Sequence, residues 1–165
     1  MSKGRPIRAY DYVNHPYDAV RETLHDDARG LFVEATRAAA SRASSVAAGL
    51  HVNIGGLEVG AEIAITVFQV QDVEKGPLDR PATRVELEWE AASSPGLFPL
   101  MNGQLWAYAL SSTETQLDFD GVYEPPLGLV GAAVDAAVGH RIAEASVHRF
   151  VTDVATHLRR TLTSG

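Results

Sequence analysis

The sequence contains no cysteine, which excludes disulfides, thiolate metal ligands and a cysteine nucleophile. Its first residues form no apolar signal segment, and no apolar run approaches the length of a membrane span. Basic residues are also few, because 14 Lys and Arg face 21 Asp and Glu, for a net charge of −7. Proteins that bind nucleic acids need basic surfaces to displace counterions. We therefore expect a cytoplasmic protein with no nucleic-acid partner and no stable membrane insertion.

Motifs of common catalytic and cofactor sites are missing as well. The sequence has no Gly-x-Ser-x-Gly, Walker or Gly-x-Gly-x-x-Gly pattern. The histidines form no His-x3-His pair and no pair flanked by Glu. Without cysteine, a zinc site would need a cluster of His and carboxylate ligands, which the spacing does not supply. We expect no metal ion and no other cofactor.

The sequence has enough apolar residues for one well-formed core. Its hydrophobic content is 45%, and the 165 residues suit a single domain covering positions 1–165. Two prolines at 125 and 126 precede a segment, residues 127–162, in which apolar residues recur at helical spacing. The residues that share one face of this predicted helix are Leu129, Ala136, Ala143, Val147, Phe150, Val154 and Leu158.

Upstream of this helix, the pattern predicts strands. Residues 7–13 are β-prone, and two helices are expected next, one over residues 16–25 and one capped by Asp26 or Asp27. Apolar residues then alternate with polar or small residues in five further segments. These predicted strands cover residues 46–54, 59–67, 84–91, 102–110 and 115–123, with a Gly55-Gly56 hairpin turn between the first two. The order indicates an α+β fold in which the sheet is antiparallel.

Three segments accompany this order: residues 10–20 (YDYVNHPYDAV), 113–119 (TETQLDF) and 139–150 (GHRIAEASVHRF). Together with the order of elements, they resemble the START/Bet v 1-like (SRPBCC) superfamily, which includes polyketide cyclase/dehydrase-like and coenzyme Q-binding-like members. The resemblance covers nearly the whole chain and implies a helix-grip fold. In that fold a curved six-stranded antiparallel sheet wraps around a long C-terminal helix, with two short helices between strands 1 and 2. It further implies an apolar cavity for a small hydrophobic ligand.

Within such a cavity, the ligand would be a lipid, an isoprenoid quinone or a polyketide-like molecule. The sequence leaves open whether the protein is a non-catalytic binder, a cyclase, aromatase or dehydratase, or a protein-interaction module that can form a homodimer. As an enzyme it would use His140 with Tyr123 or Tyr108 as acid and base. The expected lining residues are His140, Ala136, Ala143, Val147, Phe150, Trp89, Leu87, Phe119, Tyr123, Leu97 and Phe98.

Several alternatives remain open at this stage. His140 either faces the cavity or is a core histidine bonded to a backbone carbonyl or tyrosine. Trp106 and Tyr108 alternate with apolar neighbours, so the pattern does not assign them to a face. Leu97 and Phe98 lie in an apolar loop that forms either a cavity rim or a protein contact. Gly139 is a weak helix position and predicts a kink or break.

Overall fold

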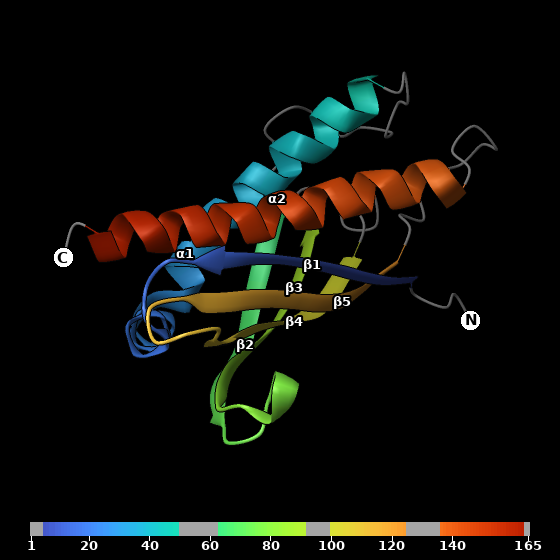
Figure 1. Ribbon diagram of the computed structural model, residues 1–165. Helices are drawn as coiled ribbons and strands as arrows, with labels where there is room; N and C mark the ends of the chain where they lie inside the picture. Colours follow the sequence, from blue (N-terminus) through green and yellow to red (C-terminus); the bar gives the residue numbers. More distant parts are fainter. Residues whose placement is uncertain (1–4, 50–62, 92–99, 125–135, 164–165) are drawn as a thin grey trace.

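The computed structural model describes residues 5–49, 63–91, 100–124 and 136–163. These residues form a five-stranded antiparallel sheet in the order β1-β5-β4-β3-β2 (Figure 1). Its strands are β1 (Arg5–Val13), β2 (Ile63–Val73), β3 (Ala82–Ala91), β4 (Leu100–Ala109) and β5 (Thr115–Glu124). Strands β2 to β5 form a meander, and β1 pairs with β5 at one edge.

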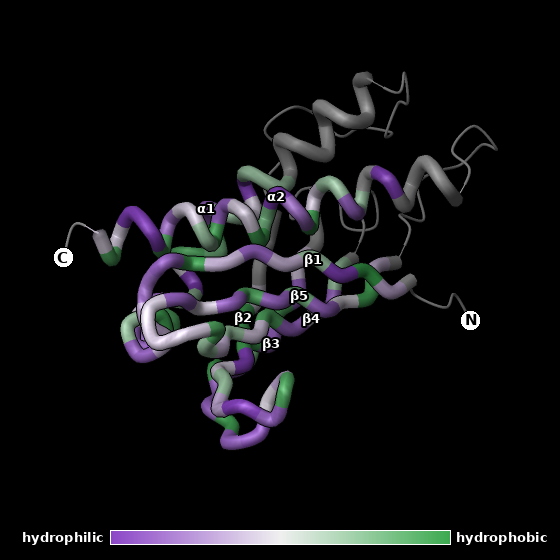
Figure 2. The backbone as a smooth tube through the Cα atoms, in the orientation of Figure 1, coloured by the Kyte–Doolittle hydropathy of each residue, from purple (hydrophilic) through white to green (hydrophobic). Residues whose placement is uncertain are grey.

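The helices α1 (Tyr17–Gly49) and α2 (Ala136–Thr163) cover one face of the sheet, which we call the inner face (Figure 1). Helix α2 packs against α1 and β1, whereas α1 packs against β2. The strands alternate as predicted, because Val85, Leu87 and Trp89 are buried while Glu86 and Glu88 between them are partly exposed. Figure 2 shows this alternation as changes of hydropathy along the strands. The core therefore lies between the inner face and the helices.

The predicted strand over residues 46–54 is wrong at its start, since residues 46–49 are the end of α1. The period-two pattern there rested partly on Ala47, Ala48 and Gly49, and alanine is the best helix former. Residues 50–54, the Gly55-Gly56 turn and residues 59–62 lie outside the described residues. The described sheet consequently has five strands rather than six.

The two short helices expected after β1 form one 33-residue element, α1, with an interruption at Asp27. The backbone there leaves the helical region (φ −155°, ψ 55°), and Asp27 Oδ1 accepts the Gly30 N–H at 3.0 Å. Asp27 is thus the expected N-cap, which supplies an acceptor to a helix start that lacks one. The segment after it is long rather than short, because it continues to Gly49.

The predicted break at Gly139 is also wrong, because α2 is continuous from Ala136 to Thr163. An interior glycine costs a helix only about 1 kcal/mol relative to alanine. A long helix with one apolar face against a sheet recovers that cost by packing. Val130 and Val134, which motivated a separate first half, lie outside the described residues.

Four strands have their ends at the same edge of the sheet. Trp89 pairs with Met101, Met101 with Tyr123, and Ile63 with Ala91, all at one end of the sheet. Segments 50–62, 92–99 and 125–135 therefore join the described strands at this same end.

Candidate functional site

The predicted site residues that the structure describes lie together between the inner face and α2. Each of them is at most 2% exposed, and they belong to β3, β5 and α2. They are Leu87, Trp89, Phe119, Tyr123, Ala143, Val147 and Phe150. A surface buried to this extent on three elements is the apolar part of a hydrophobic core or ligand site.

Four aromatic rings meet at the centre of this surface, and Phe150 of α2 touches the other three. Its ring centroid lies 4.9 Å from that of Trp89, 5.9 Å from Phe119 and 5.5 Å from Phe32. Trp89 and Phe119 are 6.1 Å apart with nearly parallel planes. Such distances are typical of favourable aromatic pairs. Phe32 of α1 is not among the lining residues expected from the sequence.

Two glycines make room for one of these rings. Gly103 and Gly121 are cross-strand partners in β4 and β5. A Cβ atom built on Gly103 would lie 2.4 Å from the Phe119 ring, and one on Gly121 would lie 2.7 Å from it. Any other residue would displace the ring from the aromatic group. A glycine inside a predicted strand is a known signal for such a close approach.

The remaining predicted site residues fall outside what the structure describes. His140 and Ala136 belong to the backbone of α2, but their side chains are not among the described parts, and Leu97 and Phe98 lie outside the described residues altogether. Their roles stay predictions. Tyr123 is buried on the inner face at the end of β5.

Tyr108 and Trp106 both lie on the outer face of the sheet, away from the helices. The Tyr108 hydroxyl donates a hydrogen bond to Asp118 Oδ2 at 2.7 Å, and burial together with this bond raises its pKa to about 12. Trp106 is half-buried, with the Arg84 guanidinium 5.6 Å from its ring centroid. Tyr108 therefore does not share a face with Tyr123, which leaves Tyr123 as the tyrosine of the inner face.

A polar network that sequence reasoning missed ties α1 to the sheet at the end opposite Tyr123. Tyr17 donates to Thr83 Oγ1 (2.8 Å), and Thr83 donates to Asp72 Oδ1 (2.8 Å). His25 and Arg21 contact the same carboxylate at 3.0 and 3.3 Å. Asp72 belongs to β2, which continues beyond the strand predicted over residues 59–67.

Partial burial raises the pKa of Asp72, but the hydrogen bonds from His25 and Thr83 and the charge of Arg21 outweigh this effect and lower it overall. Burial, opposed in part by the bond to Thr83, raises the pKa of Tyr17. Both shifts keep Tyr17 a neutral donor and Asp72 a charged acceptor. The network can therefore hold two elements together.

Within the described parts of the chain, no group of three or more His, Asp or Glu side chains is arranged to hold a metal ion. Nor does any helix there combine the length and the apolarity that crossing a membrane requires.

Comparison with known proteins places the fold. A conserved protein from Geobacillus kaustophilus has a similar structure, with a TM-score of 0.50 and 12% identity over 95% of this chain and 97% of that one. The Zhui aromatase/cyclase from Streptomyces sp. R1128 matches with a TM-score of 0.44 and 15% identity, covering 96% and 95% of the two chains. A START superfamily protein from Mycobacterium smegmatis matches with a TM-score of 0.39 and 9% identity, covering 96% and 99%.

No family model matches the sequence, and no curated protein matches it. The antiparallel sheet, the pairing of β1 with β5 and the C-terminal helix on the inner face are consistent with the expected α+β helix-grip arrangement, with five described strands in place of six. At such low identity the likeness concerns the fold alone, because one fold supports many functions.

Proposed function

We propose that this protein binds a small hydrophobic ligand between the inner face of its sheet and α2. The observation that carries the proposal is the meeting of four aromatic rings from α1, β3, β5 and α2 on one apolar surface. Ligand sites are mostly apolar and aromatic, with few polar groups. The ligand class is a lipid, an isoprenoid quinone or a polyketide-like molecule, for which these rings supply apolar contacts.

The proposed lining consists of the described residues on this surface together with four whose side chains the structure does not describe. Tyr123 and His140 are the polar groups of the set, and they would orient an oxygen atom of the ligand. The others supply apolar area. The set is His140, Ala136, Ala143, Val147, Phe150, Trp89, Leu87, Phe119, Tyr123, Leu97 and Phe98.

The two tryptophans of the chain permit a direct test, because Trp89 is on the inner face and Trp106 on the outer face. In a Trp106→Phe variant, Trp89 is the sole tryptophan. Titration with oleate, a short-chain isoprenoid quinone and an anthraquinone should change its emission saturably for at least one of these probes. Saturation at about 100 times Kd should also stabilise the fold by roughly 2.7 kcal/mol, measured as a rise in Tm.

The matched control is Trp89→Phe, in which only Trp106 emits. Because Trp106 lies on the opposite face, its emission should not respond to the same probe, while a cooperative melting curve establishes that this variant is folded. An unchanged Trp89 emission and Tm with all three probes would refute the proposal.

A second candidate function is a cyclase, aromatase or dehydratase, in which His140 and Tyr123 act as acid and base. The position of Tyr123 favours it, since this hydroxyl-bearing side chain is buried on the apolar inner face and acid–base groups act in sites from which water is excluded. In that case His140→Ala and Tyr123→Phe would each abolish turnover of a linear polyketide-like substrate, while the Trp89 emission would still respond to saturating ligand through the remaining apolar contacts. If neither variant lost turnover, His140 and Tyr123 would not be the acid and base, and ligand binding would remain the proposed function.

A further inference from the structure

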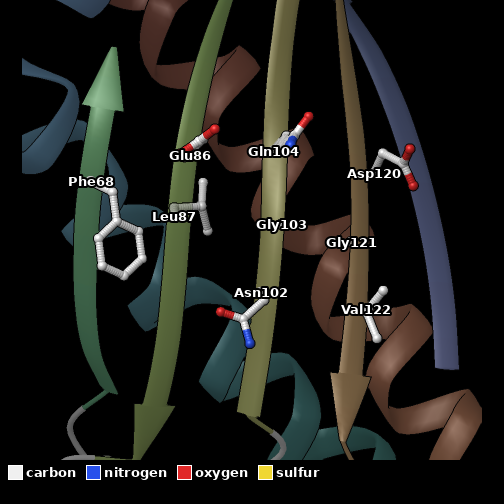
Figure 3. A pocket seen from close by; sticks show the side chains of 9 residues that line it. All are labelled: Phe68, Glu86, Leu87, Asn102, Gly103, Gln104, Asp120, Gly121 and Val122. Carbon is white, nitrogen blue, oxygen red and sulfur yellow. The ribbon is translucent and has the colours of Figure 1, made fainter. Parts of the chain in front are cut away.

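The outer face of the sheet carries a hollow of about 490 Å³, on the side opposite the helices (Figure 3). Residues of four strands, β2 to β5, line it. They are Phe68, Glu86, Leu87, Asn102, Gly103, Gln104, Asp120, Gly121 and Val122. The volume lies within the range of about 300–1,000 Å³ that is usual for small-molecule sites. This hollow lies on the opposite face of the sheet from the proposed hydrophobic site. Leu87 of β3 borders both, because it lines the hollow although its side chain is buried in the core of the inner face.

Phe68 lies at an irregularity in β2. The pairing register between β2 and β3 shifts between Val67 and Gln69, so that Phe68 is the extra residue of a bulge. Bulges often lie beside functional sites. The Phe68 side chain lies on the outer face, 60% exposed, at one side of the hollow (Figure 3). Val122, 44% exposed, lies at the other side.

The polar groups between these apolar residues are amides and carboxylates. Asn102 and Gln104 each offer both donors and acceptors, and Glu86 and Asp120 offer acceptors. These side chains stand on neighbouring strands, as Figure 3 shows, and Gln104 is the cross-strand partner of both Glu86 and Asp120. The hollow therefore combines one exposed aromatic ring with a dense array of hydrogen-bonding groups.

Arginines next to the hollow balance its two carboxylates. Arg84 Nη2 lies 3.4 Å from Glu86 Oε1. Arg8 is the cross-strand partner of Asp120, so the two share the outer face. Among the described residues that line the hollow itself, none is positively charged. This arrangement favours neither an anion, which the protein's charge of −7 would repel, nor a cation, which would compete with the arginines.

We propose that this hollow is a binding site for a neutral carbohydrate. A sugar ring has an apolar C–H side, which packs against the face of an aromatic ring such as Phe68. Its hydroxyls each donate and accept, as the amides of Asn102 and Gln104 do, and they donate to the carboxylates of Glu86 and Asp120. The site is shallow and open to water, so we expect millimolar affinity.

The test is an amide NMR titration of the full chain with the methyl α-glycosides of glucose, galactose, mannose and N-acetylglucosamine. At least one should produce saturable shifts confined to the amides around Phe68, Gly103 and Gly121. Phe68→Ala should weaken that binding by about tenfold or more. Phe68→Tyr, which keeps the ring, should restore it. Because the ligand is neutral, added salt should leave the affinity unchanged.

The matched control is Tyr10→Ala, which removes another exposed aromatic ring from the outer face but does not line the hollow. It should bind the glycoside as the unmodified protein does. Phe68 and Tyr10 are both exposed, so equal Tm values would show that neither variant has lost its fold. Absence of saturable shifts with all four glycosides would overturn the proposal. So would binding of the cation agmatine to the same amides with an affinity that falls as salt is added.

Discussion

Single aromatic residues show how the two faces of the sheet differ in chemistry. On the inner face, Phe119 and Trp89 contact other rings and are fully buried. On the outer face, the hydroxyl of Tyr108 is bonded to a carboxylate, and Trp106 packs under a guanidinium. These two outer-face rings thus have polar partners, as expected where a strand faces water.

Tyr108 provides a prediction at this scale. Its pKa is raised from 10.0 to about 12, first by burial and second by the hydrogen bond to the charged Asp118. Because the folded pKa exceeds the unfolded one, the stabilisation is complete below pH 10 and is lost as pH rises from 10 to about 12. Tyr108→Phe should remove this part of the alkaline loss, measured by urea denaturation across that window.

Asp118→Asn is the companion variant, since it removes the charge but keeps a hydrogen-bond acceptor. An ultraviolet titration should then show the last tyrosine ionising at lower pH than in the unmodified protein. If the highest tyrosine pKa persists in Tyr108→Phe, another tyrosine is responsible and the assignment fails.

At the scale of the elements, α1 shows how one side chain can divide a helix. The capping carboxylate of Asp27 ends one helical segment and begins the next. The first segment is held to β2 and β3 through Tyr17, Arg21 and His25, while the second carries Phe32 into the aromatic group. The interruption lets the two segments follow different directions over the sheet.

Asp27→Ala should therefore destabilise the protein by about 1 kcal/mol, within the roughly 0.5–2 kcal/mol measured for lost N-caps. The cause is that the Gly30 N–H loses its acceptor. Urea denaturation gives the free energy of unfolding. Asp27→Asn is the matched control, because its amide oxygen can still accept that bond, and it should retain most of the stability. Equal losses in both variants would show that the cap is not the source.

The elements also show what a sequence pattern can and cannot predict. Strands β3 and β5 were predicted to within a few residues, because Val85, Leu87 and Trp89 alternate cleanly with glutamates. Residues 46–49 were misassigned because small residues such as Ala47 fit both a helix and a strand. The network around Asp72 could not be foreseen, since it joins residues distant in sequence, and its geometry depends on the register of β2 with β3.

On the scale of the whole molecule, Asp72 links the helical layer to the sheet. Its carboxylate receives bonds from β3 through Thr83 and from α1 through His25 and Arg21. The apolar core lies mainly between the same two layers. A polar link at one end therefore complements the aromatic packing further along the inner face.

Asp72→Asn should lower the free energy of unfolding near neutral pH by on the order of 1 kcal/mol, a small value because the carboxylate is partly exposed. The pKa of Asp72 is depressed below 3.8, so its contribution is present above that pH and is lost as pH falls through the folded value. The difference between the variant and the unmodified protein should therefore shrink in acid. Tm measured for both proteins as a function of pH gives the difference near neutral pH and its decrease in acid.

Asp26→Asn is a suitable control, because Asp26 is an exposed carboxylate on the same helix. The Asp26→Asn substitution should change the free energy of unfolding little at any pH. A constant difference between Asp72→Asn and the unmodified protein down to strongly acidic pH would contradict the proposed role of the charge.

The pairing of β1 with β5 has a consequence for how the molecule is made. Thr115 donates its hydroxyl proton to the carbonyl of His15, a contact across 100 positions of the chain. On the ribosome, β1 emerges long before its only sheet neighbour exists, since the sheet order places nothing else beside it among the described strands. Closing such long loops is slow, so we expect folding to be post-translational in its last step and slow for a chain of this size.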